Sequence, residues 1–133
     1  MSAVMTEPDL LTIDVPGGVA GFPSSETFVL VELSSSSPFF RLRSLDETGL
    51  DFLVVPPAVF FPDYASEIDD ASAARLELTD AEDALLLVVL TVGDDAGSAT
   101  ANLMAPIVLN ARTRQAAQVI VEGTYPLRAL LRS

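Results

Sequence analysis

Residues 84–90 read Ala84-Leu85-Leu86-Leu87-Val88-Val89-Leu90, the longest uninterrupted apolar stretch of the chain. A helix that crosses a bilayer needs about 20 apolar residues, so this stretch is far too short to span a membrane. A run of leucine and valine is typical of a strand that is buried on both faces. We therefore interpret it as a buried β-strand.

On both sides of this stretch, short apolar segments alternate with turns rich in proline, glycine and serine, and they lack helical i, i+3, i+4 stripes. Eight such segments predict a mostly β fold, a compact antiparallel β-barrel-like single domain. One short helix is expected at 70–76, followed by the Thr-x-x-Glu spacing of a capping box at 79–82. Residues 110–114 are expected to join two strands as a hairpin. The predicted strands are 11–15, 28–33, 39–44, 50–55, 64–68, 85–92, 101–109 and 115–122.

The length of 133 residues fits one domain, which we place at 11–131, with a poorly ordered N-terminus at 1–10. Half of the residues are apolar, which is enough for a hydrophobic core. Residues 1–11 carry Glu7 and Asp9 where a signal peptide would be apolar, and the chain has no cysteine. We therefore expect a cytoplasmic protein without disulfides.

The net charge of −12 is concentrated in the middle of the chain. Between Asp46 and Asp95 there are 13 carboxylates and one arginine, Arg75, whereas the remainder has six of each sign. A field of this sign repels nucleic acid and anionic lipid and attracts basic partners. We expect no direct nucleic-acid binding and no membrane binding, although surface carboxylates also serve solubility alone.

The residue types present exclude most catalytic chemistry. Without histidine, lysine or cysteine, the chain lacks a serine triad, a Ser/Lys pair, a thiolate nucleophile and the usual transition-metal ligands. Acidic pairs such as Asp94-Asp95 lack the ligand spacing of a calcium loop. We predict no catalytic residues, no metal and no cofactor. Two other functions stay open, namely a hydrolase that uses carboxylates alone and a β-barrel carrier for a small apolar ligand.

The segment 60–69 is the most informative local feature. In a strand, Asp63, Glu67 and Asp69 would point to one face, and Tyr64 and Ile68 to the other. This pattern fits an ordinary half-buried strand with a solvated face. At a sheet edge, the same strand would offer negative charge and unpaired backbone groups to a basic extended segment.

Several sequence blocks, from about residue 10 to residue 131, resemble the flagellar assembly factor FliW family. They occur here in an order and spacing that are similar to those of that family. The blocks are GVAGFP at 18–23, SPFFRLRSLD at 37–46, FLVV at 52–55, FFPDY at 60–64, TANLMAPIVLN at 100–110, TR at 113–114, QV at 118–119 and YPLR at 125–128.

The resemblance implies a barrel-like fold and a regulatory role in the cytoplasm. Members of this family bind newly made flagellin and, when it is exported, bind and antagonise CsrA, an RNA-binding repressor of flagellin mRNA translation. The negative charge fits this role, because CsrA must be basic where it holds RNA. A flagellin chaperone without a CsrA role is the nearest alternative, and we expect a monomer or weak homodimer.

The candidate partner-binding residues follow from these motifs. Asp63, Glu67, Asp69 and Asp70 are predicted to meet the basic partner, with Tyr64 as an aromatic anchor. Asn102 and Pro106 are predicted to mark an edge or bulge suited to peptide docking, because proline interrupts strand pairing. For the phenylalanines at positions 39, 40, 60 and 61, a place in the core is favoured over a place in a partner interface.

Overall fold

The computed structural model describes residues 10–19, 21–33, 38–62, 64, 70–79, 83–91, 99–121, 125–126 and 128–131. Residues 1–9 lie outside this part of the chain, so the predicted division into 1–10 and 11–131 stays a prediction. The elements in chain order are β1 (Leu10–Asp14), β2 (Thr27–Glu32), β3 (Phe40–Ser44), β4 (Asp51–Val55), the 3-10 helix η2 (Pro57–Val59), α1 (Asp70–Arg75), β5 (Ala84–Thr91), β6 (Thr100–Ala101), β7 (Ile107–Asn110), β8 (Gln115–Gln118) and β9 (Ala129–Leu130).

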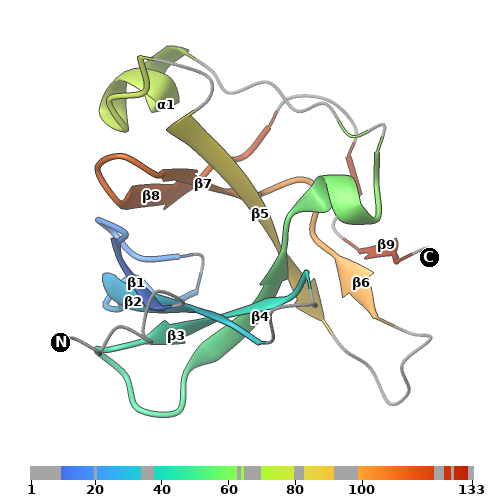
Figure 1. Ribbon diagram of the computed structural model, residues 1–133, viewed down its shortest axis with the longest axis horizontal. Helices are drawn as coiled ribbons and strands as arrows, with labels where there is room; N and C mark the ends of the chain where they lie inside the picture. Colours follow the sequence, from blue (N-terminus) through green and yellow to red (C-terminus); the bar gives the residue numbers. More distant parts are fainter. Residues whose placement is uncertain are drawn as a thin grey trace, which may run out of the picture.

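Seven of the described strands close into a barrel (Figure 1). In the order β4-β3-β2-β1-β8-β7-β5 each strand pairs with the next, and β5 pairs back with β4 to complete the ring. The pairings in the ring are antiparallel except for that between β1 and β8. Strands β6 and β9 extend the sheet from β5. The predicted mostly β, barrel-like fold with one short helix is confirmed.

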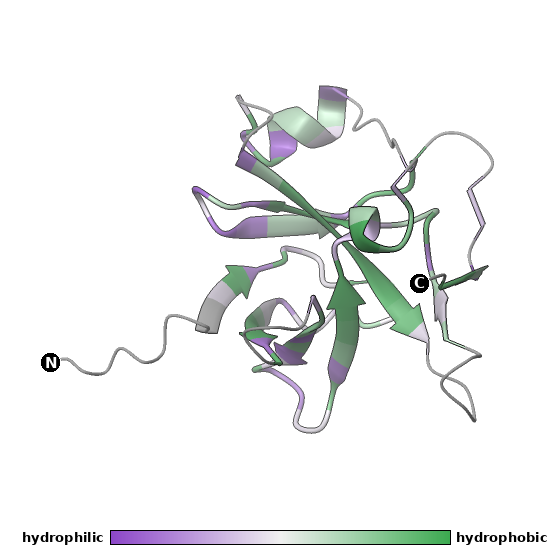
Figure 2. Cartoon of the chain, turned by 45° about the vertical axis from the view of Figure 1, so that its right-hand side comes forward, coloured by the Kyte–Doolittle hydropathy of each residue, from purple (hydrophilic) through white to green (hydrophobic). Residues whose placement is uncertain are grey.

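Strand β5 pairs with three other described strands, and in this way it closes the barrel and joins β6 to it. One edge pairs with β4 over 88–90, and the other pairs with β7 over 84–87 and with β6 over 90–91. Both faces are covered as well. Leu85, Leu87 and Val89 pack into one apolar cluster, whereas the residues between them pack into two others. This explains the continuous apolar run, which Figure 2 shows as an almost uniformly hydrophobic strand.

The barrel interior is filled by side chains that alternate along the strands. Strand β2, for example, buries Phe28 and Leu30, while Val29 and Val31 between them are only partly buried. This two-residue period is the expected pattern for strands with one face toward the core. The buried residues of this interior cluster are Ile13, Val15, Val19, Phe28, Leu30, Leu42, Val54, Leu87, Ile107, Leu109 and Ala116.

Two further apolar clusters lie on the outer face of the sheet. One, under α1, contains Leu76, Val108 and Val119. The other forms around Val88 and Leu90, and it is covered by aromatic side chains that include Phe39, Phe60 and Phe61. Phe40 packs against the interior cluster instead. All four phenylalanines predicted for the core therefore pack against it, each partly buried.

The strand predicted at 101–109 is wrong, because it is divided into β6 and β7. If the β6 register continued, Met104 would lie opposite Leu87, but Ile107 occupies that position, so three extra residues bulge out. Two features explain the bulge. The amide oxygen of Asn102 accepts hydrogen bonds from the backbone N–H groups of Met104 and Ala105, and Pro106 has no N–H for the ladder.

The remaining differences are smaller. Tyr64 lies outside any strand, and residues 65–68 of the strand predicted at 64–68 lie outside the described residues. Strand β8 ends at Gln118 rather than at 122, because Val119 and Val121 donate to the carbonyls of the bulge at Pro106 and Met104. The predicted helix ends one residue early, at Arg75, and the capping box at 79–82 falls partly outside the described part of the chain. No helix among the described residues is long and apolar enough to cross a membrane.

Candidate functional site

Four of the seven predicted site residues are described, and they fall in two places. Tyr64, Asn102 and Pro106 lie together at the bulge, whereas Asp70 is the exposed first residue of α1. Asp63, Glu67 and Asp69 lie outside the described residues, so their role as an acidic partner-binding face stays a prediction.

Tyr64 attaches its segment to the bulge. Its hydroxyl donates a hydrogen bond of 2.6 Å to the carbonyl oxygen of Leu103, the residue after Asn102. Its ring meets Tyr125 edge to face, with the centroids 4.9 Å apart. The ring is partly buried against the cluster around Val88 and Leu90. Tyr64 therefore already has intramolecular contacts on its ring and its hydroxyl.

The bulge and Pro106 have different roles. Pro106 is fully buried, and its carbonyl oxygen accepts a bond of 2.9 Å from the N–H of Val119. It anchors the bulge to the chain after β8 and exposes no docking edge itself. Asn102 is half-buried at the other end of the bulge, and its backbone N–H donates to the carbonyl of Val89.

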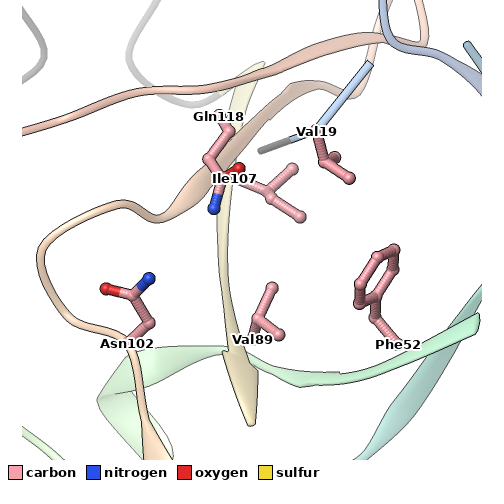
Figure 3. A pocket seen from close by; sticks show the side chains of 6 residues that line it. All are labelled: Val19, Phe52, Val89, Asn102, Ile107 and Gln118. Carbon is pink, nitrogen blue, oxygen red and sulfur yellow. The ribbon is translucent and has the colours of Figure 1, made fainter. Parts of the chain in front are cut away.

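A hollow of about 180 Å³ lies beside Asn102 at the mouth of the barrel. Val89, Ile107 and Phe52 line it, and these residues belong to the interior cluster or pack against it. Figure 3 shows the nitrogen of the Asn102 amide on the side that faces the other labelled side chains, while the oxygen points away toward the bulge. The lining is completed by Val19 and Gln118.

A second hollow of about 410 Å³ adjoins the first, because Val19 and Gln118 line both. We call the two hollows together the groove. The twelve lining residues that the structure describes are Gly17, Gly18, Val19, Gly21, Pro23, Phe52, Val89, Asn102, Ala105, Ile107, Gln118 and Ile120.

The groove lies where the barrel is incompletely paired. Within the described residues, β1 and β8 pair only at Asp14 and Gln115. Pro16 has no N–H to continue the ladder, and Gly17 and Gly18 have positive φ angles that turn the chain away from β8. The seam between the two strands therefore opens toward the end of β8.

The glycine turn forms one wall of this opening. A Cβ atom at Gly18 would lie 2.2 Å from the carbonyl oxygen of Phe22, so only glycine fits there. At Gly17 and Gly21 a Cβ atom would meet nothing within 4 Å. Gly18 is thus packed tightly against the turn, whereas there is room for a Cβ atom at Gly17 and Gly21.

The opposite wall is held by side-chain amides. Gln118 donates a hydrogen bond of 3.0 Å to the carbonyl oxygen of Ala105, which ties β8 to the bulge. Ile120, after the end of β8, lines the outer hollow and is 71% exposed, the largest value among the large exposed hydrophobic residues described. The groove therefore combines apolar side chains with polar groups of the backbone and of the Asn102 and Gln118 amides.

The described lining of the groove carries no charge. None of these twelve residues is ionisable, although the chain has 26 charged residues, 19 acidic and seven basic. Among the described residues, no group of carboxylates is arranged to hold a metal ion.

The sequence interpretation found Asn102 but missed the residues that form the two walls of the groove. Gly18, Val19 and Gln118 lie in two of the blocks that carry the family resemblance, 18–23 and 118–119. Membership of these blocks was the only indication that the three residues matter. The distance between the two blocks along the chain could not show that they lie side by side in the fold. Ile120 carried no signal of its own.

Comparison with known proteins gives one consistent result. The model of the FliW protein family matches residues 2–131, so the match begins earlier than the blocks near residue 10 indicate. The flagellar assembly factor FliW of Bacillus licheniformis is 42% identical over 113 residues, which cover 85% of this chain and 79% of that protein. FliW of Geobacillus kaustophilus is 42% identical over 107 residues, covering 80% and 74% of the two chains.

The fold agrees with a solved structure. A crystal structure of the flagellar assembly factor FliW superimposes with a TM-score of 0.84 at 36% identity, covering 93% of this chain and 86% of that one. The similar proteins are thus named as assembly factors rather than as enzymes.

Proposed function

Because the chain belongs to the FliW family of flagellar assembly factors, we propose that it binds flagellin in the cytoplasm and, once released, binds and antagonises CsrA, relieving repression of flagellin mRNA translation. The observation that carries the proposal is the family match over residues 2–131, nearly the whole chain. The protein acts by binding alone, with no catalytic step.

The charge distribution supports a basic partner. The segment from Asp46 to Asp95 holds the entire net charge of −12, and such a field accelerates the encounter with a basic, RNA-binding protein. We place this contact on Asp63, Glu67, Asp69 and Asp70. Asp70 is exposed at the start of α1, where it is accessible to a partner.

The burial pattern argues against the hydrolase. A hydrolase that uses carboxylates alone needs an inward pair in one cleft. The buried polar side chains of the described residues are Ser25, Ser44, Ser72 and Asn110, and none of them is a carboxylate.

A small-ligand carrier would need an enclosed cavity of several hundred Å³. The barrel interior is instead filled around Phe28, Leu42 and Leu87. The hollow of about 180 Å³ at its mouth belongs to an open groove. A protein partner fits this shape better than an enclosed small molecule does.

Calorimetric titration against purified flagellin and purified CsrA, at low and high salt, tests the proposal. We expect saturable binding to both, with the CsrA affinity falling as salt rises. The triple variant Asp63→Asn, Glu67→Gln, Asp69→Asn should weaken CsrA binding by at least tenfold. Its matched control, Asp14→Asn, Glu32→Gln, Glu122→Gln, removes as much charge outside the acidic segment and should have little effect.

The outcomes separate the alternatives. Binding to flagellin alone would leave a flagellin chaperone without a CsrA role, and binding to neither would overturn the proposal. If both triple variants weakened CsrA binding equally, net charge rather than the face formed by Asp63, Glu67 and Asp69 would govern the interaction.

A further inference from the structure

Toward the described residues, the side chain of Asn102 forms hydrogen bonds through its oxygen only. Its oxygen accepts from the N–H groups of Met104 and Ala105, at 3.0 and 3.1 Å. These two bonds fix the plane of the amide and place the nitrogen toward the groove (Figure 3). Among the described residues, no group accepts a hydrogen bond from this nitrogen. Within the described part of the chain, the groove therefore presents an oriented donor that is not used.

The surroundings of this donor indicate what it would bind. A charged acceptor such as a carboxylate would meet no cation among the described lining residues, in a chain of net charge −12, which is unfavourable. A neutral carbonyl oxygen avoids that cost and matches the amide N–H. Backbone carbonyls of a polypeptide are the commonest acceptors of this kind.

The described lining offers no ion pair to a basic segment. None of the twelve described lining residues is a carboxylate, so an arginine or lysine side chain against them would lose its hydration without gaining an ion pair. At the outer end, Ile120 exposes 71% of its surface and can be covered only by an apolar contact. The uncharged described lining and the exposed side chain of Ile120 both favour an occupant that is uncharged and apolar.

From this complementarity we infer that the groove docks an uncharged, apolar segment of a protein partner, with one of its backbone carbonyls accepting a hydrogen bond from Nδ2 of Asn102 and its apolar side chains covering Ile120. The inference rests on the proposed binding function. It adds the groove as a second binding surface beside the acidic one. Docking in the groove is insensitive to salt, in contrast to binding at the acidic segment.

Nuclear magnetic resonance tests the groove without any natural partner. The ¹⁵N-labelled protein is titrated with a short capped peptide of alternating leucine and serine, and separately with the same peptide carrying arginine in place of serine. We expect the uncharged peptide to shift the side-chain NH₂ signals of Asn102 and the backbone signal of Ile120, unchanged by salt. No shift at these signals, or an equal shift with the arginine peptide, would overturn the inference.

Dilution of the free protein is part of the same test. If the Asn102 and Ile120 signals moved with protein concentration in the absence of peptide, a second copy of this chain would occupy the groove, and the assignment to a partner segment would be wrong. Constant signals are the expected result.

Two variants then connect the groove to a natural partner, with flagellin as the probe. Asn102→Asp keeps an oxygen for the N–H groups of Met104 and Ala105 but removes the donor and adds a charge. Ile120→Asp places a charge at the outer end. Leu130→Asp is the matched control, because Leu130 is a comparably exposed leucine on β9, outside the groove.

We expect each groove variant to weaken flagellin binding by about tenfold or more and Leu130→Asp to leave it unchanged, with all three proteins folded by circular dichroism. Unchanged binding by both groove variants would overturn the inference while leaving flagellin binding itself intact. If the parent protein failed to bind flagellin, the proposed function would fail, and the peptide titration would still decide whether the groove docks an apolar segment.

Discussion

The side-chain nitrogen of Asn110 lies 2.8 Å from the carbonyl oxygen of Leu76, just beyond the C-terminal end of α1. Asn110 is fully buried at the end of β7, and its oxygen accepts from the backbone N–H groups of Arg112 and Thr113 at 2.9 and 3.2 Å. One side chain thus fixes both the β7–β8 turn and the position of α1 against the barrel. Asp70, one of the residues predicted to meet a basic partner, is the first residue of this helix.

Replacing Asn110 with alanine should destabilise the fold strongly. The change leaves buried backbone groups on two elements without partners, and it should lower the free energy of unfolding by about 2–4 kcal/mol. Urea denaturation measures this loss. Arg112→Ala is the matched control, since it removes a bond to Glu77 and an ion pair with Asp83 on the exposed side of the same junction and should cost at most about 1 kcal/mol. Equal losses for the two variants would contradict the assigned role of Asn110.

Leu87→Ala tests the central role of β5. Leu87 is 1% exposed and packs in the barrel interior, so its truncation should leave a cavity and lower the free energy of unfolding by about 3–5 kcal/mol. Leu45→Ala, at a leucine that is 56% exposed, should change it by less than about 0.5 kcal/mol. Thermal and urea unfolding of both variants would show whether burial at β5 governs stability, and a loss below about 1 kcal/mol at Leu87 would argue against it.

The glycine turn allows a comparison of three similar positions. Gly17, Gly18 and Gly21 all have positive φ angles, so alanine at any of them should cost about 1–2 kcal/mol from backbone strain. At Gly18 the new Cβ atom would also collide with the backbone of Phe22 and Pro23, raising the loss to about 3–5 kcal/mol. Chemical denaturation of the three alanine variants should therefore place Gly18→Ala apart from the other two. Similar losses at all three positions would show that the backbone of Phe22 and Pro23 can shift to accommodate a Cβ atom at Gly18.

Much of the fold could be predicted because it depends on local patterns. The apolar run at 84–90 reads as a strand buried on both faces, and β2 and β3 show a two-residue alternation of burial. The hairpin at 110–114 and the helix at Asp70 were predicted within one residue. In each case the residues that determine the structure lie next to one another in the chain.

The bulge and the groove could not be predicted in the same way. The run 101–109 has the composition of a strand, but the Asn102 side chain competes with β5 for the N–H groups of the bulge. The outcome depends on the register of Leu87 against Ile107, which is a long-range property. The groove likewise forms from the glycine turn and the end of β8, which lie about 100 residues apart in the chain. No pattern among neighbouring residues can therefore predict it.

Tyr64→Phe separates a structural role of Tyr64 from a role as partner anchor. The change removes the hydroxyl that donates to Leu103 at 2.6 Å but keeps the ring against Tyr125. We expect the free energy of unfolding to fall by about 0.5–1.5 kcal/mol, because one partly buried hydrogen bond is lost. Since Leu103 is in the bulge, backbone hydrogen exchange at Met104 and Ala105 should accelerate as well.

Binding measurements complete this test. If Tyr64 contributes to a partner contact through its ring, Tyr64→Phe should bind flagellin and CsrA like the parent protein, whereas Tyr64→Leu, which removes the aromatic face, should weaken one of them. Unchanged binding by both variants, together with the expected loss of stability, would assign Tyr64 to the support of the bulge alone. A large loss of binding with Tyr64→Phe and no loss of stability would instead place the hydroxyl at the partner rather than at Leu103.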